Sequence, residues 1–224
     1  MELEQDKIDL IEKVIKSNHK YENNEDLYDD FFNETCKRSL LIIKTIASDI
    51  AEGPLQQAKN NIKREHLEKK IETRLGDGLD TYSKEINTII ISGMGGKTII
   101  GILKKNPKVL KEIDTLILSP NNYQEDVKRY CCKSGFLIQN EEFVKDKNFI
   151  YQILILKRGK KHYSKKEYFF GPVFLIKKGP LFHEYYEREK KSREILLSLL
   201  PKNFYYKRLI TKKEINWIQK EIED

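Results

Sequence analysis

Several features that define common protein classes are missing from this chain of 224 residues. The three cysteines are an odd number without C-x-x-C spacing, which excludes a disulfide framework or a zinc ribbon and favours reduced thiols in a cytoplasmic protein; they are Cys36, Cys131 and Cys132. No apolar run approaches the roughly 20 residues of a membrane span. The acidic, amphipathic start, MELEQDKIDL, does not resemble a signal peptide, so we expect no membrane association.

Familiar catalytic motifs are missing as well. The four histidines have no metal-ligand spacing, so no metal site is expected; they are His19, His66, His162 and His183. There is no G-x-S-x-G elbow, and neither Cys131 nor Cys132 has the sequence context of a nucleophile, so both are expected to pack on an inner helix face. Ile91 stands where a P-loop ending at Gly96-Lys97-Thr98 needs its first glycine, which excludes that motif.

Positive charge is concentrated near the C-terminus. The whole chain has 42 Lys and Arg against 35 Asp and Glu, a formal charge of +7. The segment from Lys157 to Asp224 has 18 Lys and Arg against 9 Asp and Glu, so it carries all of the excess. A basic appendage on a nearly neutral body is typical of binding to a polyanion, because each pairing with a phosphate releases a counterion. The alternative is a lysine-rich helix surface that is simply solvated.

Aliphatic runs that alternate with helical segments predict an open, mostly parallel α/β sheet, because strands buried on both faces read as continuous apolar runs. The expected strands are Leu40–Ile50, Ile71–Leu75, Thr88–Ser92 and Thr115–Ser119, with Phe136–Ile138 and Phe149–Lys157 as a closing antiparallel pair. Helices are expected at 3–16, 55–70, 97–105 and about 124–134. No element is assigned to the polar, acidic range 17–38.

The C-terminal segment predicts a helical hairpin. A long helix is expected over Leu181–Leu200, stopped by Pro201. Thr211-x-x-Glu214 fits a capping box that would open the last helix, after a connection near Lys202–Ile210. Four tyrosines in this segment are expected to pack between helices, with stacking on exposed bases as the alternative; they are Tyr185, Tyr186, Tyr205 and Tyr206. We expect domains at 1–160 and 161–224.

Loops at the carboxyl ends of the strands carry residues suited to ligand binding, since ligands of open α/β sheets bind there. Asp49 either accepts hydrogen bonds from a ribose diol or caps the following helix. Asp77, between two glycines, suits an adenine amino group or a polar turn, and alone it favours the turn. The run Gly93–Gly96 lets backbone approach a ligand closely. Pro120-Asn121 ends the next strand.

Taken in order, these strand ends resemble the bacterial TrmK family, tRNA methyltransferases that modify N1 of the adenine at position 22 with S-adenosylmethionine. The resemblance covers most of the chain from about residue 39. It rests on ASDIAEGPLQQAKNNI (Ala47–Ile62), RLGDGLD (Arg74–Asp80), IIISGMGG (Ile89–Gly96), LILSPN (Leu116–Asn121), YQILILKR (Tyr151–Arg158) and FGPVFLIKKGPLFHEYYEREK (Phe170–Lys190). It implies a Rossmann-like methyltransferase domain followed by a coiled-coil-like helical hairpin that binds tRNA, in a cytoplasmic protein that we expect to be a monomer.

The resemblance also implies site residues. Asp49, with Ile50 beside it, would hold the ribose of the cofactor, and Asp77 with Gly76 and Gly78 would contact its adenine. On the substrate side, Gly93, Met94 and Gly95 would border the methyl donor and the target base, and Asn121 would face the substrate. Adenine N1 is unprotonated at neutral pH and attacks the sulfonium methyl directly, so proximity would supply most of the rate.

The chain departs from the family pattern at one place. The family has a glycine-bearing first loop, an acidic-x-Gly start followed by Asp-His, that wraps the methionine end of the cofactor. Here the chain reads LYDDFF (Leu27–Phe32) upstream of Asp49, and no glycine precedes Gly53. Either residues 17–38 are an altered segment, as a reading-frame error would produce, or cofactor binding is weakened. The alternatives to an active tRNA methyltransferase are a non-catalytic tRNA-binding relative and a methyltransferase of another substrate.

Overall fold

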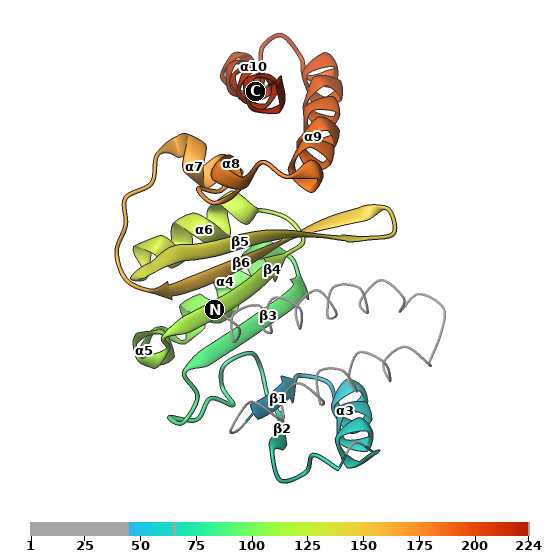
Figure 1. Ribbon diagram of the computed structural model, residues 1–224, viewed down its shortest axis with the longest axis vertical. Helices are drawn as coiled ribbons and strands as arrows, with labels where there is room; N and C mark the ends of the chain where they lie inside the picture. The colour runs from blue at the N-terminus through green and yellow to red at the C-terminus, as the bar shows by residue number, and fades with distance from the viewer. Residues whose placement is uncertain (1–44, 65, 224) are drawn as a thin grey trace. The chain divides into compact units, whose positions relative to one another are not determined.

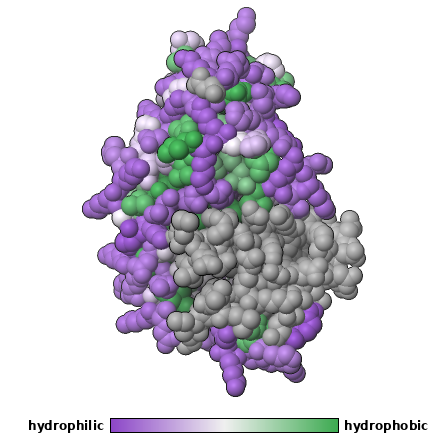
Figure 2. All heavy atoms as spheres, in the orientation of Figure 1, coloured by the Kyte–Doolittle hydropathy of each residue, from purple (hydrophilic) through white to green (hydrophobic). Residues whose placement is uncertain are grey.

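The computed structural model describes residues 45–64 and 66–223, and the chain divides into two compact units at Lys161 and His162. The expected helix at 3–16 and the polar segment at 17–38 lie outside the described residues. No helix of the described part is long and apolar enough to cross a membrane. On the face drawn in Figure 2, the described residues are mainly hydrophilic, with smaller hydrophobic patches among them.

The first described elements are two parallel strands joined through a helix. β1 (Thr45–Asp49) pairs with β2 (Ile71–Leu75), so that Asp49 lies opposite Leu75 at their carboxyl ends. Between them, α3 (Glu52–Arg64) has an acidic first turn and a basic last turn, which suits the helix dipole. The helix ends earlier than the expected residue 70. A small core joins its last turn to the strands; it contains Ala47, Ile62, Leu67 and Ile71.

A second sheet has four strands in the order β3-β4-β6-β5, which lie side by side in Figure 1. These strands are β3 (Thr88–Met94), β4 (Thr115–Pro120), β5 (Phe136–Asp146) and β6 (Phe149–Arg158). β3 and β4 are parallel, whereas β4 with β6 and β5 with β6 are antiparallel. The closing antiparallel pair is confirmed, but β5 is far longer than the expected Phe136–Ile138. Among the described strands, parallel and antiparallel pairings are equally frequent rather than mostly parallel.

The core of the first unit lies on both faces of β4. Leu116 and Leu118 point to one face and Ile117 to the other, and all three are fully buried. Such two-sided burial is the reason why β4 and β6 read as continuous aliphatic runs. Three helices follow β3 and β4: α4 (Gly96–Lys105), the unpredicted α5 (Pro107–Glu112) and α6 (Gln124–Lys133). α4 adds Ile99 and Leu103 to the core, and α6 adds Val127. This α/β arrangement confirms the predicted fold class.

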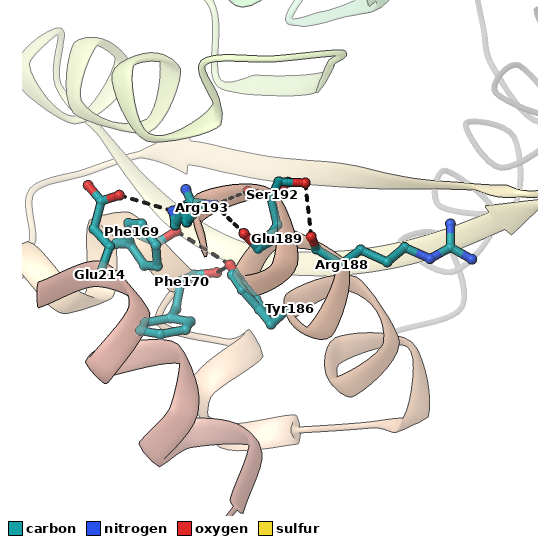
Figure 3. Close-up of polar contacts among 8 residues, drawn as sticks. All are labelled: Phe169, Phe170, Tyr186, Arg188, Glu189, Ser192, Arg193 and Glu214. Carbon is teal, nitrogen blue, oxygen red and sulfur yellow. Dashed lines mark hydrogen bonds and ion pairs between the residues drawn. The ribbon is translucent and has the colours of Figure 1, made fainter. Parts of the chain in front are cut away.

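The second unit is helical and has an aromatic core. Its helices are α7 (Lys165–Phe170), α8 (Phe174–Lys177), α9 (Pro180–Leu199) and α10 (Tyr205–Glu223); α7 and α8 were not predicted. Ser164 and Glu167 form a capping box that starts α7. The hydroxyl of the buried Tyr186 donates to the carbonyl of Phe170 at 3.0 Å, as Figure 3 shows. Tyr186 packs against the rings of Phe170 and Phe182, so helix packing is confirmed for this tyrosine.

The predicted antiparallel hairpin is present, with one correction. Arg193 of α9 contacts Glu189 on its own helix and donates from Nε to Glu214 of α10 at 3.0 Å (Figure 3). Arg208 donates to the carbonyl of Leu197 at 2.9 Å, which fixes the antiparallel direction. The capping box at Thr211 is wrong, because α10 already begins at Tyr205 and the Thr211 hydroxyl donates to a carbonyl inside the helix.

Candidate functional site

The carboxyl ends of β1 and β2 form one group of predicted site residues. One carboxylate oxygen of Asp49, Oδ1, accepts a hydrogen bond from the amide of Ala51 at 2.8 Å. The amide of Gly76 donates to the carbonyl of Asp49 at 3.0 Å, which fixes the two strand ends beside each other. Ile50 is 72% exposed. This bond closes a short turn before α3, which begins at Glu52, so Asp49 holds the turn rather than capping the helix. The other oxygen of its carboxylate has no partner in the described part of the chain.

The turn after β2 is held by α4. Gly78 has a φ of 61°, a left-handed conformation, and a Cβ there would lie 2.8 Å from Ile102 of α4. Asp77 forms an ion pair with Lys105, one turn further along the same helix. This pair raises the pKa of Lys105, and both side chains remain largely exposed. The ion pair supports the interpretation of Asp77 as part of a polar turn. The sequence analysis did not single out its partner, Lys105.

The ends of β3 and β4 form a second group. The sheet register shifts at Gly93, whose φ is 72°, and the amide of Asn121 then donates to the carbonyl of Met94 at 2.9 Å. The side chain of Asn122 accepts from the amide of Gly96 at 3.0 Å and so caps the start of α4. The sequence analysis missed Asn122, although the repeated asparagine after Pro120 was a visible signal.

The three glycines of the Gly93–Gly96 run have different reasons to be there. At Gly96 a Cβ would lie 2.4 Å from the carbonyl oxygen of Asn122, so close packing excludes any side chain. Gly93 supplies the positive φ of the bulge. At Gly95 the nearest atom to a Cβ is Asn122 Oδ1 at 3.3 Å, and the backbone is ordinary extended chain. A side chain at Gly95 would need Asn122 to move by a few tenths of an ångström, so packing constrains Gly95 less than Gly96.

Tyr123 is a second residue at this edge that the sequence analysis missed. Its φ of 54° is left-handed, which is uncommon for a bulky side chain, and its side chain is half exposed. The ammonium of Lys97 lies 4.5 Å from the centre of its ring. The two groups of site residues are bridged by α4, which starts at Gly96 beside Asn122 and contacts the Asp77 turn from its second half.

Neither a cysteine nucleophile nor a metal site is supported by the described residues. Cys131 is buried, and burial raises the pKa of its thiol, so it is no nucleophile. The predicted packing of Cys131 on an inner helix face is confirmed. Among residues 45–64 and 66–223, no group of three or more His, Cys, Asp or Glu side chains is placed to hold a metal ion.

The comparison with protein families decides what these strand ends belong to. The sequence profile of the tRNA (adenine(22)-N(1))-methyltransferases matches residues 35–223. The chain belongs to the TrmK family. The resemblance read from the six sequence segments is thereby confirmed. The Rossmann-like α/β fold is supported by its similarity to a solved structure of the NADB-Rossmann superfamily.

Individual relatives and solved structures agree with this assignment. The chain is 31% identical over 115 residues to the tRNA (adenine(22)-N(1))-methyltransferase of Bacillus subtilis, an alignment of 51% of this chain and 48% of that protein. A Streptococcus agalactiae protein of the NADB-Rossmann superfamily has 31% identity and a TM-score of 0.75, with 80% of each chain covered. A Streptococcus pneumoniae tRNA (m1A22) methyltransferase in complex with S-adenosyl-L-methionine has 27% identity and a TM-score of 0.77, covering 85% and 88%.

Proposed function

We propose that this chain transfers a methyl group from S-adenosylmethionine to N1 of an adenine in tRNA, at position 22, in the cytoplasm and as a monomer. The observation that carries the proposal is the pairing of predicted site residues at the carboxyl ends of two parallel strand pairs, β1-β2 and β3-β4. The carboxyl ends of parallel strands are where open α/β sheets bind ligands. The identities of the substrate and the cofactor are inferred from membership of the TrmK family.

The residues at the ends of β1 and β2 fit a nucleoside cofactor. Asp49 keeps one carboxylate oxygen that no described residue uses, at a strand end where a ribose diol can donate to it. The exposed Ile50 offers apolar surface to an adenine ring. Gly76, Asp77 and Gly78 form the adjacent turn, where Asp77 would accept from the amino group of adenine beside its ion pair with Lys105.

The residues at the ends of β3 and β4 suit the reacting side. S-adenosylmethionine supplies a methyl group on a sulfonium, which adenine N1 can attack without a general base. Gly93, Met94 and Gly95 would border the methyl donor and the target base, with the bare backbone of Gly95 next to Asn122. Asn121 would face the substrate, while Asn122 holds the loop rigid through the amide of Gly96. The chain's own contribution is then to position the base.

The second unit fits the role of a tRNA-binding domain, with the domains assigned as 1–160 and 161–224. Residues 161–224 have 15 Lys and Arg against 9 Asp and Glu, and within them the hairpin from Pro180 to Glu223 has 10 against 7. Phosphate contacts from lysine and arginine would supply most of the affinity and make it dependent on salt.

Methyl transfer to unmodified tRNA tests the proposal. The chain is incubated with S-adenosylmethionine labelled in its methyl group and an unmodified tRNA transcript, and the labelled position is mapped. The expected result is one methyl group on N1 of adenine 22, absent when that adenine is replaced by guanine. A correctly folded chain that transfers no label, while still binding tRNA, would instead support the non-catalytic relative.

A further inference from the structure

One stretch of the hairpin combines positive charge with a complete lack of acidic residues. Between Glu194 and Glu214 the chain contains no Asp or Glu. The same stretch contains five basic residues, which are Lys202, Lys207, Arg208, Lys212 and Lys213. It includes the end of α9, the connection and the first turns of α10. We call residues 199–210 the hairpin tip.

The hairpin tip exposes apolar and aromatic side chains that a helical hairpin does not need on its surface. Tyr205 and Tyr206 are 74% and 75% exposed, and Leu199 and Phe204 are also exposed. By contrast, Tyr186 lies in the aromatic core of the same unit with a hydrogen-bonded hydroxyl. The helix-packing interpretation therefore fails for Tyr205 and Tyr206, whose side chains are mostly exposed to solvent.

The hairpin tip is also held in a defined shape. Pro201 follows α9 and prevents its continuation. The guanidinium of Arg208 donates to the carbonyls of Leu197 and Leu200, at 2.9 Å and 2.5 Å, and so closes the end of α9. Arg208 is thus occupied within the hairpin. Lys202 and Lys207 are exposed beside the aromatic residues and have no ion pair within the described residues.

We infer that the hairpin tip binds unpaired nucleotides of the tRNA substrate, with Tyr205 and Tyr206 stacking on exposed bases and Lys202 and Lys207 contacting phosphates. This inference rests on the proposed function for the identity of the substrate. Aromatic side chains among lysines are the usual surface for single-stranded nucleic acid, since every base has a face to stack. A second copy of the chain fits poorly, because a two-fold interface would place like charges against each other.

Two double substitutions separate stacking from charge. Tyr205→Ala with Tyr206→Ala is expected to weaken binding of the full chain to tRNA about 30-fold, since stacking contributes at least about 1 kcal/mol per base. The dependence of affinity on salt stays unchanged in this variant. Tyr205→Phe with Tyr206→Phe is expected to bind as the parent does. Lys202→Ala with Lys207→Ala is expected to lower the slope of log affinity against log salt by about 1.4, the value for two phosphate contacts to a single strand.

Controls decide between this inference and its competitors. Ile176→Ala, at an exposed apolar residue in α8, is expected to bind tRNA like the parent. The inference is overturned if the tyrosine-to-alanine variant, with parental helical content by circular dichroism, binds tRNA within twofold of the parent. It is also overturned if these tyrosines are needed for self-association in sedimentation, or for binding to anionic vesicles, and not for tRNA.

The outcome is separable from that of the proposed function. If the parent methylates tRNA and the tyrosine variant binds tRNA equally well, the inference about the hairpin tip fails and the methyltransferase stands. If the parent transfers no methyl group but its tRNA binding requires Tyr205 and Tyr206, the methyltransferase fails and the inference stands.

Discussion

At the scale of single residues, steric contact separates glycines that the fold requires from one that it does not. Gly96 is needed because the carbonyl of Asn122 occupies the space of a side chain, and Gly78 is needed for its left-handed backbone. Gly95 has an ordinary extended conformation and room for a methyl group with a small movement of Asn122. A requirement for glycine at position 95 would therefore come from a ligand rather than from folding.

This difference gives a paired prediction. Gly95→Ala is expected to change the free energy of unfolding by less than about 1 kcal/mol and to lower methyl transfer at least about tenfold, because the methyl group obstructs the approach of the base. Gly96→Ala is expected to destabilise the protein by about 1–3 kcal/mol through overpacking. Urea unfolding and transfer rates measure both. Equal transfer by Gly95→Ala and the parent would remove Gly95 from the site.

Asp49 allows its two roles to be tested apart. Asp49→Asn keeps an oxygen that can accept from the amide of Ala51, so stability is expected to change by less than about 0.5 kcal/mol. The loss of the carboxylate is expected to weaken binding of S-adenosylhomocysteine about tenfold, because a charged acceptor makes the stronger hydrogen bond to a hydroxyl. Calorimetry and thermal unfolding provide the two readouts. Parental affinity in this variant would leave Asp49 with its turn-forming bond to Ala51 alone.

At the scale of elements, helix α6 is tied to strand β5 by an ion pair that no solvent reaches. Nζ of Lys128 lies 3.0 Å from Oε1 of Glu141, and both side chains are fully buried. Both residues belong to segments whose sequences read as polar, VKRYCCK and QNEEFVK, so the pairing was not predictable from periodicity. Buried charges of this kind fix which elements pack together more than they add to stability.

Removing one partner of this pair is expected to lower the free energy of unfolding far more than replacing both partners with apolar residues. Lys128→Met alone leaves the Glu141 charge in the core without its cation and is expected to reduce the free energy of unfolding by about 3–5 kcal/mol. The double variant Lys128→Met with Glu141→Leu is expected to recover most of that loss. Urea titration of parent, single and double variants measures the difference. A double variant less stable than the single one would contradict this account.

In the second unit, Glu221 of α10 is placed between two lysines. Burial alone would raise the pKa of its carboxyl, but the ammonium groups of Lys166 and Lys178 outweigh burial and lower the pKa below its ordinary value. A carboxyl with a lowered folded-state pKa stabilises the protein above its unfolded pKa, about 4.3. That stability disappears as the pH falls through the folded pKa.

The resulting prediction concerns acid unfolding of the helical unit. Glu221→Gln is expected to lower stability by about 1–3 kcal/mol at pH 7 and to lose less stability than the parent as the pH falls below about 4.3. Trp217, the one tryptophan of the chain, lies in α10 and reports this unit by fluorescence. Glu223→Gln, at an exposed neighbour, is the control. Identical pH profiles for Glu221→Gln and the parent would refute the role of the lysines.

At the scale of the whole molecule, the sequence predicted what long-range burial dictates and missed what local contacts decide. The aliphatic run at Thr115 identified β4 because both faces of that strand are buried, whereas the run at Thr88 identified β3 although Ile90 is exposed. The strand β5 was truncated because its outer part, QNEEFVKD, is polar and paired only with β6. The start of α10 was misplaced because Thr211 and Glu214 imitate a capping box inside a helix that begins with exposed tyrosines.

In the candidate site, by contrast, the sequence predicted the local strand ends and missed the long-range contacts. Asp49, Asp77 and the glycine run were identified because strand ends are recognisable in sequence. The contact of Lys105 with Asp77 spans 28 positions of the sequence, and that of Asn122 with Gly96 spans 26. No local sequence pattern predicts contacts over such separations. The identity of the cofactor came from the resemblance to a family rather than from any single motif.

Calorimetric titration of the full chain with S-adenosylmethionine tests the central claim most directly, since the account requires a cofactor pocket at the carboxyl ends of β1 to β4. The account predicts binding at one site with micromolar affinity, weakened by Asp49→Asn and unaffected by Ile176→Ala. Absence of binding at millimolar cofactor, in a chain whose circular dichroism and Trp217 fluorescence are those of the folded protein, would contradict it.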